Sequence, residues 1–506
     1  MTPAVELIGI HKRFGAVWAN RGVDLTVAKG SIHGLVGENG AGKSTLMSIL
    51  YGAYQPTSGT IRIDGREVRL RSPRDAIACG IGMVHQHFML IDTLSVLENI
   101  LLGAEGGALL AKGKAAMRDR LAQLAQAYGL AVDPDAMAGD LGVGLRQRVE
   151  ILKALVRGAN ILILDEPTAV LTPSEADQLF RMLRVLRDEG KTILIVTHKL
   201  REIMDVTDHV SVMRRGEMVA HVATRDTSPE DLANAMVGRE VSLRVERTPA
   251  AAGRTILSVD NLVVRDADGV ARVDGVSLQV RAGEIVGVAG VAGNGQSELL
   301  EALAGMRAGA SGVIAFDGAS IDPWRIGPRR MRSLGLMHVP EDRHHHGLVM
   351  GFEACESAML GFQQEDRYGD RLLDRAAIET DLAQQMQTYD VRPRDPRLET
   401  RGFSGGNQQK IVLAREIERA PKLLLIGQPT RGVDIGAIEF IDKRLIALRD
   451  AGAAILLVSV ELDEIMGLSD RILVMCGGRI TGELDGPTAT AGEIGLLMAG
   501  VARRAA

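Results

Sequence analysis

The chain has 506 residues and is 46% hydrophobic, which is enough apolar material for two or three domains with buried cores. No run approaches about eighteen uninterrupted apolar residues, and the N-terminus lacks the basic-then-apolar layout of a secretory signal, so we expect a cytoplasmic protein without membrane spans. The net charge of −5 gives no reason to expect nucleic acid as the main partner. Three scattered cysteines fit neither a disulfide framework nor a zinc site.

A glycine-rich turn near the N-terminus lies between two predicted elements. The apolar stretch Ser31–Val36 predicts a buried strand, and Leu46–Tyr54 has the spacing of a helix. Glycines let successive backbone N–H groups converge on anionic oxygens, and the start of the helix adds its partial positive charge. We therefore predict that this turn binds the phosphates of a nucleoside triphosphate. Its residues are Gly37, Glu38, Asn39, Gly40, Ala41, Gly42, Lys43, Ser44 and Thr45.

Two side chains of the turn have predicted roles of their own. Lys43 supplies a cation for the outer phosphates, and the Ser44 hydroxyl is placed to ligate Mg²⁺. Phe14 precedes the first core strand, where a flat ring could stack on adenine. A phenylalanine of the core accounts for that position equally well.

Polar side chains follow three later strands of the first half. One apolar strand ends near Gln86, which could reach Mg²⁺ and the attacking water, although a glutamine at an exposed strand end is common. The run Ile161–Leu164 ends in Asp165, placed to hold Mg²⁺, and Glu166, placed to polarise water. His198 follows another buried strand at the same predicted edge of the sheet. These strand ends predict a catalytic site beside the phosphate-binding turn.

The sequence repeats after about 250 residues, so the chain consists of two homologous halves. Gly30–Gly37 recurs as Gly283–Gly290, and Ile161–Thr168 recurs as Leu423–Thr430. Each half alternates short β-branched runs with longer helical patterns, which predicts an α/β fold around a mostly parallel sheet.

The stretch Arg239–Arg254 separates the two halves. It contains proline, alanine and charged residues with little periodicity, which predicts a short linker. We therefore expect two domains, residues 1–240 and residues 255–506, joined by residues 241–254.

Taken in order, these segments resemble the nucleotide-binding domains of the ATP-binding-cassette (ABC) superfamily over nearly the whole chain. The resemblance implies two tandem P-loop ABC ATPase domains, each with a mostly parallel sheet core and a helical subdomain, and ATP and Mg²⁺ as cofactors. It also implies a set of functional segments. These are the Walker A motif at Gly37–Thr45, the Q-loop at Gln86, the Walker B motif at Ile161–Asp165, the catalytic Glu166, the switch His198 and the adenine-stacking Phe14.

The family's LSGGQ signature would fall at Leu141–Leu145 in the first half and at Phe403–Asn407 in the second. The first copy has Gly142 and no hydroxyl. The second copy keeps a hydroxyl and glycine N–H groups suited to a γ-phosphate: Ser404, Gly405 and Gly406, followed by Asn407.

The second half has lost the charged groups of its own Walker motifs. Its phosphate loop keeps the glycines but has Gln296 at the position of the lysine. Gly427 and Gln428 stand where the first half has its two carboxylates, Val460 replaces the histidine, and Ala267 replaces the aromatic residue. Single groups of this kind are commonly worth about 10²–10³ in rate, so we expect no useful hydrolysis there.

In this family, two cassettes dock head to tail, and each ATP lies between the Walker A motif of one and the signature of the other. The first-half Walker motifs and the second-half signature then make one complete site. The converse pairing is defective on both faces. We therefore expect one competent and one degenerate site, most simply within a single chain.

Two cassettes on one chain look like the ATPase subunit of a simple-sugar or nucleoside importer. The resemblance implies that ATP binding and hydrolysis drive uptake through two membrane-spanning permease subunits, with an extracytoplasmic solute-binding protein, at the cytoplasmic face of the inner or plasma membrane. No nucleic acid is expected as a partner. The alternative is a soluble two-cassette ATPase acting on ribosomes or nucleic acid, but such proteins usually carry a long charged linker and two intact sites.

Overall fold

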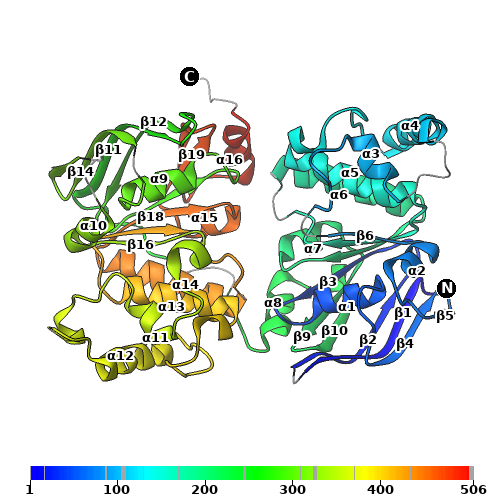
Figure 1. The fold of residues 1–506 in the computed structure, drawn as a ribbon, viewed down its shortest axis with the longest axis horizontal. Helices are drawn as coiled ribbons and strands as arrows, with labels where there is room; N and C mark the ends of the chain where they lie inside the picture. Colours follow the sequence, from blue (N-terminus) through cyan, green and yellow to red (C-terminus); the bar gives the residue numbers. More distant parts are fainter. Residues whose placement is uncertain are drawn as a thin grey trace. The chain divides into compact units, whose positions relative to one another are not determined.

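The computed structural model contains two compact units, Met1–Leu243 and Arg244–Ala506. Each unit has one six-stranded and one four-stranded sheet with helices packed around them (Figure 1). The α/β fold predicted for both halves is confirmed, with a mostly parallel sheet at the centre of each unit. The structure describes residues 2–15, 17–85, 88–103, 110–128, 130–168, 171, 173–242, 247–307, 309–322, 327–369, 371–433 and 435–500.

The six-stranded sheet forms the core of the first unit. In spatial order its strands are β10 (Glu217–Ala223), β9 (His209–Arg214), β3 (Ile32–Gly37), β8 (Thr192–Val196), β7 (Ile161–Asp165) and β6 (Ile81–Val84). β9 and β10 pair antiparallel, whereas the other neighbours pair parallel. Every residue of β3, β7 and β8 is buried. Because other layers cover both faces of the sheet, these strands are almost continuously apolar.

The α-helices described in the first unit are α1 (Lys43–Leu50), α2 (Pro73–Ala78), α3 (Val96–Leu101), α4 (Leu110–Tyr128), α5 (Val143–Val156), α6 (Pro173–Asp188), α7 (Leu200–Val206) and α8 (Pro229–Val237). Leu162 and Leu164 of β7 share a buried cluster with residues of α3, α4, α5 and α6. Ile161 and Ile163 share another buried cluster with residues of α1 and of the four-stranded sheet of this unit. Alternate residues of one strand therefore contact opposite layers.

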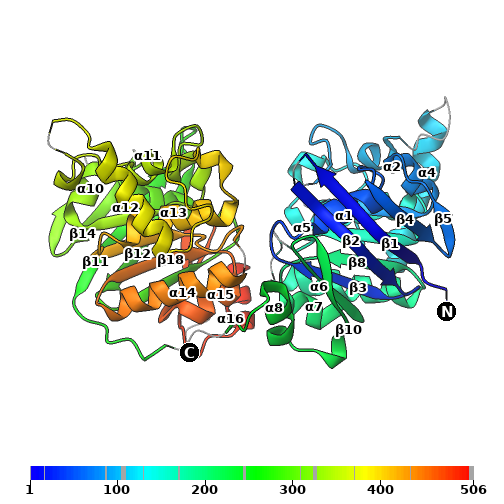
Figure 2. The ribbon, with the colours of Figure 1, turned by 90° about the horizontal axis from the view of Figure 1, so that it is seen from below.

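The four-stranded sheet of the first unit is antiparallel and is not predicted by the sequence analysis. Its order is β2 (Val17–Val27), β1 (Val5–Phe14), β4 (Ser58–Ile63) and β5 (Arg66–Val68), and Figure 2 shows β1 and β2 in front of α1. The pairing of β1 with β2 shifts register three times between Leu7 and Arg13. Such irregularities interrupt the two-residue alternation by which strands are recognised in sequence.

Helix α1 begins at Lys43, three residues before the predicted helix, and ends at Leu50. The residue before it, Gly42, has a φ of 102° and caps the helix in the left-handed region. Apolar spacing places the start at Leu46 because the first turn is polar. The structure therefore puts both the lysine and the serine of the glycine-rich turn inside the helix.

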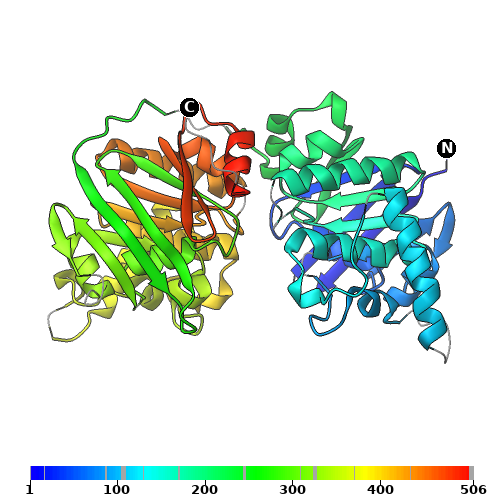
Figure 3. The ribbon, with the colours of Figure 1, turned by 90° about the horizontal axis from the view of Figure 1, so that it is seen from above.

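The second unit repeats this architecture. Its six-stranded sheet has the order β20 (Arg479–Asp485), β19 (Arg471–Cys476), β13 (Ile285–Ala289), β18 (Ala454–Ser459), β17 (Leu423–Gly427) and β16 (Leu336–Val339). Its antiparallel sheet has the order β12 (Ala271–Arg281), β11 (Thr255–Arg265), β14 (Ala310–Phe316) and β15 (Ala319–Ile321), the long green strands of Figure 3. Strand for strand, both orders match those of the first unit, so the internal repeat is confirmed.

The α-helices described in the second unit are α9 (Gln296–Leu303), α10 (Pro328–Leu334), α11 (Ala354–Met359), α12 (Arg375–Thr388), α13 (Gly405–Ile417), α14 (Ile435–Asp450), α15 (Leu462–Leu468) and α16 (Ala491–Met498). Nowhere in the described ranges does a helix combine the length and the apolar character that crossing a bilayer needs.

Residues 247–254, which fall in the predicted linker, belong to the second unit and contact the rest of it. The Arg247 guanidinium donates to the Ser469 carbonyl oxygen at 2.7 Å. The guanidinium of the buried Arg449 donates to the Thr248 carbonyl oxygen at 2.9 Å, and the Gly253 N–H donates to the carbonyl oxygen of Ala282 at 2.8 Å. This part of the segment is thus held against the rest of the second unit.

A buried histidine lies on β3, the strand that leads into the glycine-rich turn. His33 Nε2 lies 2.9 Å from Ser211 Oγ, which in turn lies 2.8 Å from His221 Nδ1. The rings of His33 and His221 are stacked with centroids 5.3 Å apart. Burial, helped by the neighbouring His221 and His209, lowers the pKa of His33 to about 3. The folded first unit therefore holds this imidazole neutral at pH values where an unfolded chain protonates it.

We predict that acid destabilises the first unit partly through His33. Its folded pKa is depressed, so its contribution to stability is present above pH 6.5 and is lost as the pH falls toward 3. Between pH 7 and pH 5, the free energy of unfolding should fall by about 2 kcal/mol more in the parent than in a His33→Gln variant. Urea unfolding followed by Trp18 fluorescence measures this once Trp324, the other tryptophan, is replaced by phenylalanine.

The control for this measurement is the same pair of proteins above pH 7.5. There the imidazole is neutral in both the folded and the unfolded state, so the difference between the two proteins should not change with pH. Equal acid sensitivity in both proteins would contradict the prediction.

Candidate functional site

The glycine-rich turn connects β3 to α1 in a conformation that requires glycine. Gly40 and Gly42 have φ values of 81° and 102°. A Cβ on Gly37 would lie 2.2 Å from the Met213 carbonyl oxygen, and one on Gly42 would lie 2.2 Å from that of Ala19. Backbone therefore packs directly on backbone here. The turn ends at the N-terminus of α1, where unpaired N–H groups and the helix dipole favour an anion.

Lys43 folds back over this turn. Its side chain is buried, and its ammonium donates to the carbonyl oxygens of Gly37 at 2.6 Å and Glu38 at 3.0 Å. Burial lowers the pKa of Lys43, while the nearby Glu166 and Asp165 act in the opposite direction. The ammonium is thus already desolvated at the turn. A phosphate there would offer it charge-assisted hydrogen bonds, which are stronger than those to carbonyl groups.

Ser44 and Asp165 are brought together by the first turn of α1 and the end of β7. The Ser44 hydroxyl hydrogen-bonds the buried Asp165 carboxylate. Burial raises the pKa of Asp165, and repulsion from Glu166 adds to the effect. Mg²⁺ prefers oxygen ligands and is commonly held by one or two carboxylates together with substrate phosphates. The pair has the donor atoms for Mg²⁺, and a cation there would relieve the repulsion.

Glu166 and His198 meet because β7 and β8 are neighbouring parallel strands. Asp165 pairs with Val196 in the register, and the Glu166 N–H donates to the Val196 carbonyl oxygen at 2.8 Å. Glu166 has a φ of 47°, a strained value for a residue other than glycine. Its Oε1 lies 3.0 Å from His198 Nδ1, and this hydrogen bond holds the pKa of Glu166 below its usual range. The carboxylate is thereby oriented and kept ionised, as a group that polarises water must be.

A buried carboxylate that the sequence analysis did not assign to the site supports both strand ends. Glu202 of α7 accepts hydrogen bonds from the hydroxyls of Thr168, after β7, and Thr197, after β8. The Thr197 hydroxyl also accepts the N–H of Lys199 at 3.0 Å. These bonds connect the two segments that carry Glu166 and His198. The sequence signal for Glu202 is the recurrence of Glu202-Ile203-Met204 in the second half as Glu464-Ile465-Met466.

One predicted residue, Phe14, is not joined to this cluster, and another, Gln86, lies outside the described residues. Phe14 ends β1 and is 43% exposed, so it is no part of a core. Its ring lies edge-on to Tyr54 with centroids 5.3 Å apart, and the Lys12 ammonium lies 4.8 Å from its centre. An exposed aromatic surface is available there, and its stacking on adenine stays a prediction.

The second unit repeats the backbone of this site without its charges. Gly293 and Gly295 have φ values of 87° and 101°, close to those of the first turn. The Gln296 amide donates to the Val291 carbonyl oxygen at 3.2 Å, so the side chain folds back over the loop as Lys43 does. Gln428 has a φ of 49°, and its N–H donates to the strand β18 at 2.8 Å, as that of Glu166 does to β8.

The two signature segments also share one backbone conformation. Gly142 precedes α5 with φ −61° and ψ 157°, and Ser404 precedes α13 with φ −63° and ψ 157°. The Ser404 hydroxyl caps no helix N–H and instead accepts from the Asn407 amide at 2.8 Å. A Cβ on Gly142 would meet no atom within 4 Å. The missing hydroxyl of the first signature is therefore a difference in chemistry and not in fold.

A family model and three similar proteins agree on the kind of protein to which this chain is related. The ABC transporter family model matches residues 20–169 and 273–431. The chain is 47% identical to the guanosine import ATP-binding protein NupO of Bacillus subtilis (strain 168), over 100% of this chain and 99% of that protein. It is 46% identical to the nucleoside import ATP-binding protein NupA of Lactococcus lactis subsp. cremoris (strain MG1363), over 98% of each. It is 45% identical to the glucose import ATP-binding protein TsgD13 of Haloferax volcanii, over 98% of this chain and 96% of that protein.

We predict that His198 determines the pH below which the rate of ATP hydrolysis falls, which is the acidic limb of the pH–rate profile. Replacing it with alanine removes the hydrogen bond that lowers the pKa of Glu166, so Glu166 should protonate at higher pH. The limb should move to higher pH, and the maximal rate should fall by about 10²-fold or more. A pH–rate profile that extends to below pH 4.5, the ordinary pKa of a glutamate, measures both effects. His11→Gln, which changes a histidine of β1, is the control, and an unmoved limb in His198→Ala would contradict the prediction.

Proposed function

The chain belongs to the ABC transporter family, and from this membership we propose that it is the ATP-hydrolysing subunit of an importer for a nucleoside or a simple sugar. The observation that carries the catalytic part is the Glu166–His198 pair beside the Ser44–Asp165 pair at one edge of the sheet. The choice of solute is supported by relatives whose names specify guanosine, nucleoside or glucose import.

In the proposed mechanism, the turn Gly37–Thr45 binds the ATP phosphates through its backbone N–H groups. Lys43 neutralises charge on the outer phosphates, and its desolvation strengthens that interaction. Mg²⁺ would be held by Ser44 and Asp165, with Gln86 as a further ligand, and would neutralise charge on the phosphates. Phe14 stacks on the adenine.

Glu166 is the proposed group that polarises the attacking water. Its ionised form is favoured by the hydrogen bond from His198, which also orients it. His198 contacts the γ-phosphate in this proposal. Both side chains follow adjacent parallel strands, so their separation is set by the sheet and needs no flexible loop.

The complete hydrolytic site includes the signature of the second cassette. Ser404, Gly405 and Gly406 present a hydroxyl and N–H groups at the start of α13, and in the proposal they reach the γ-phosphate held by the first cassette, with Asn407 next to them. The converse pair is the degenerate site, with Gly142 in its signature and Gln296 in its loop. The functional cassettes are proposed to be residues 1–240 and 255–506, joined by residues 241–254.

The other components of the proposed importer are separate chains. The transported solute has to cross the bilayer through two membrane-spanning permease subunits. An extracytoplasmic solute-binding protein delivers the solute. The chain itself would then work at the cytoplasmic face of the inner or plasma membrane, bound to the permease subunits.

We predict that Lys43→Ala and Ser404→Ala each lower ATP hydrolysis by the reconstituted complex by about 10²-fold or more, because each removes a group that stabilises charge on the transferred phosphoryl group. Ser333→Ala is the control, since its exposed hydroxyl only bonds the Arg330 carbonyl oxygen within α10. Full activity in Ser404→Ala would rule out the pairing of the first Walker motifs with the second signature.

Uptake measurements test the choice of solute. Cells or proteoliposomes with the whole importer should take up a radiolabelled nucleoside, ribose or glucose, and Glu166→Gln should abolish that uptake because ATP turnover ceases. Competition among unlabelled guanosine, other nucleosides and sugars then identifies the preferred class. Uptake that is insensitive to Glu166→Gln for all of these solutes would refute the proposed function.

A further inference from the structure

We propose that the second unit binds a Mg²⁺–nucleotide without hydrolysing it, and that Glu341 supplies the metal carboxylate that Gly427 has lost. This inference rests on the proposed function for the identity of the ligand as ATP. It goes beyond it by assigning a ligand and a metal-binding residue to the degenerate cassette. It also revises the expectation that this cassette lacks the carboxylate altogether.

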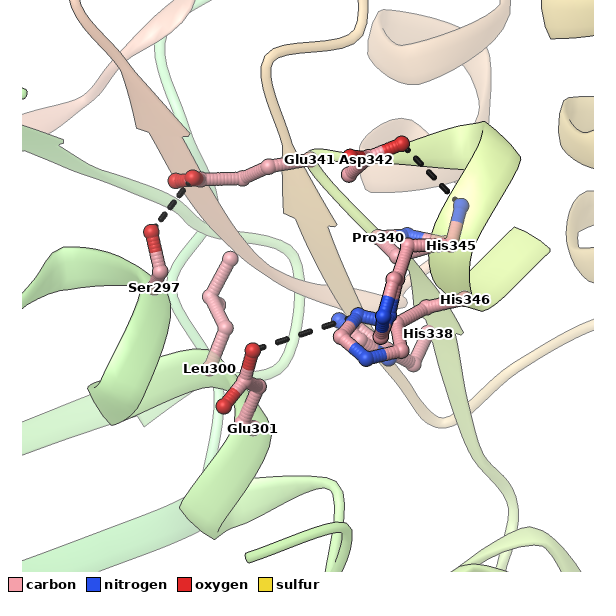
Figure 4. A pocket seen from close by; sticks show the side chains of 9 residues that line it. All are labelled: Ser297, Leu300, Glu301, His338, Pro340, Glu341, Asp342, His345 and His346. Carbon is pink, nitrogen blue, oxygen red and sulfur yellow. Dashed lines mark hydrogen bonds and ion pairs between the residues drawn. The ribbon is translucent and has the colours of Figure 1, made fainter. Parts of the chain in front are cut away.

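The first supporting contact joins Glu341 to the phosphate loop. Glu341 follows β16, and Ser297 lies in the first turn of α9, where the first unit has Ser44. The Ser297 hydroxyl donates to Glu341 Oε2 at 2.5 Å. Figure 4 shows the two side chains pointing toward one another. A serine–carboxylate pair thus exists at the start of the loop helix in both units, as Ser44–Asp165 and as Ser297–Glu341.

The second supporting observation is that Glu341 fills the space of the missing aspartate. β16 and β17 are parallel neighbours with Val339 opposite Ile426, so Glu341 and Gly427 lie at adjoining strand ends. A Cβ built on Gly427 would lie 2.5 Å from Glu341 Cγ. The same Cβ would lie 2.9 Å from Leu300 Cδ1, so a side chain at residue 427 would require both Glu341 and Leu300 to shift. The loss of one carboxylate is matched by the gain of another on the next strand.

The same strand pairing shows which residue of the first unit corresponds to Glu341. In the first unit, β6 pairs with β7 so that Val84 lies opposite Leu164. Two residues after Val84 stands Gln86, just as Glu341 stands two residues after Val339. In the sequence, the first cassette therefore has a glutamine and an aspartate at these two positions, and the second has a glutamate and a glycine. Each cassette pairs its loop serine with the carboxylate from one of these positions, Asp165 in the first and Glu341 in the second.

The surroundings of Glu341 favour a cation. Burial raises the pKa of Glu341, and the nearby Glu298 and Glu301 act in the same direction, while Ser297 and Arg431 oppose them. A divalent cation would keep this carboxylate ionised. Within the described ranges, no group of three or more histidine, cysteine or acidic side chains is placed to hold a metal. A cation here needs phosphate oxygens as further ligands, so its binding should depend on nucleotide.

The remaining groups explain why the bound nucleotide would persist. The glycines of the second loop keep the phosphate-binding conformation, but Gln296 provides no positive charge. The cation held by Glu341 then carries a larger share of the phosphate neutralisation than in the first cassette. Gln428 and Val460 stand where a carboxylate and an imidazole would activate water, so hydrolysis lacks its base.

The hollow around this pair provides a matched control. It has a volume of about 180 Å³, and Glu301 lies on α9 beside it (Figure 4). Glu301 Oε1 lies 3.9 Å from His346 Nδ1, and Oε2 accepts from the Arg307 guanidinium at 2.9 Å. Glu301 is thus a carboxylate on the helix that contains Ser297. It takes part neither in the Ser297–Glu341 pair nor in the strand end next to Gly427.

The test is Mn²⁺ binding by the full chain with Asp165→Asn, which weakens the first metal site. Electron paramagnetic resonance should detect Mn²⁺ bound only when ATP is present. Adding Glu341→Gln should weaken that binding by about tenfold or more, and by clearly more than Glu301→Gln, which removes a nearby negative charge but no proposed metal ligand. A rescue variant, Glu341→Ala with Gly427→Asp, should restore the binding, because removal of Glu341 Cγ takes away the nearest atom to the new Cβ and the next nearest, Leu300 Cδ1 at 2.9 Å, is the end of a flexible side chain.

The outcomes separate this inference from the proposed function. ATP-dependent Mn²⁺ binding that ignores Glu341→Gln would overturn the inference, and so would the absence of any ATP-dependent Mn²⁺ in the Asp165→Asn chain. A loss in Glu341→Gln that the rescue variant does not reverse would also overturn it. ATP hydrolysis by the unmodified complex is measured separately. Hydrolysis that is absent while the Glu341-dependent signal is present would refute only the proposed function.

Discussion

The parallel pairing of β3, β8 and β7 is the constraint on which the candidate site depends. Hydrogen bonds between these strands place their carboxyl ends at one edge of the sheet. The glycine-rich turn, Asp165 with Glu166, and His198 therefore lie close together at that edge. Asp165 opposite Val196 brings Glu166 within 3.0 Å of His198. Burial of all three strands on both faces makes that register costly to change. The geometry of the site is therefore a property of the core.

The second unit shows that the backbone geometry of the loop and strand ends forms without the charged side chains of the first site. Gly295 and Gln428 adopt nearly the backbone angles of Gly42 and Glu166, although Gln296 and Gln428 have lost the charges. Backbone packing and the apolar clusters on both faces of the sheet suffice to hold the loop and the strand ends. Charged groups can therefore be lost or moved while the scaffold is kept. One chain thus contains two copies of a scaffold that differ in the charged side chains they carry.

A carboxylate can move between strands because adjoining strand ends occupy shared space. A Cβ at residue 427 would lie 2.5 Å from Glu341 Cγ, so a side chain there would require Glu341 to move. Motif comparison registers the glycine as a loss, since it treats each strand separately. The pairing of β16 with β17 is what makes the two positions a single site. Degenerate motifs are therefore best judged with their spatial neighbours in view.

Much of the fold and of the candidate site can be predicted from the sequence alone. The spacing of glycines, Lys43 and Ser44 predicts the phosphate-binding turn, and the internal repeat predicts two α/β units, because short-range patterns specify buried strands and turns. The sequence did not reveal the antiparallel sheets, whose register shifts interrupt alternation, or the start of α1 at Lys43. Only the tertiary structure decided that Glu202 supports both strand ends and that Glu341 stands beside Ser297. Those contacts join residues far apart in the chain, and only the packing of strands and helices brings such residues together.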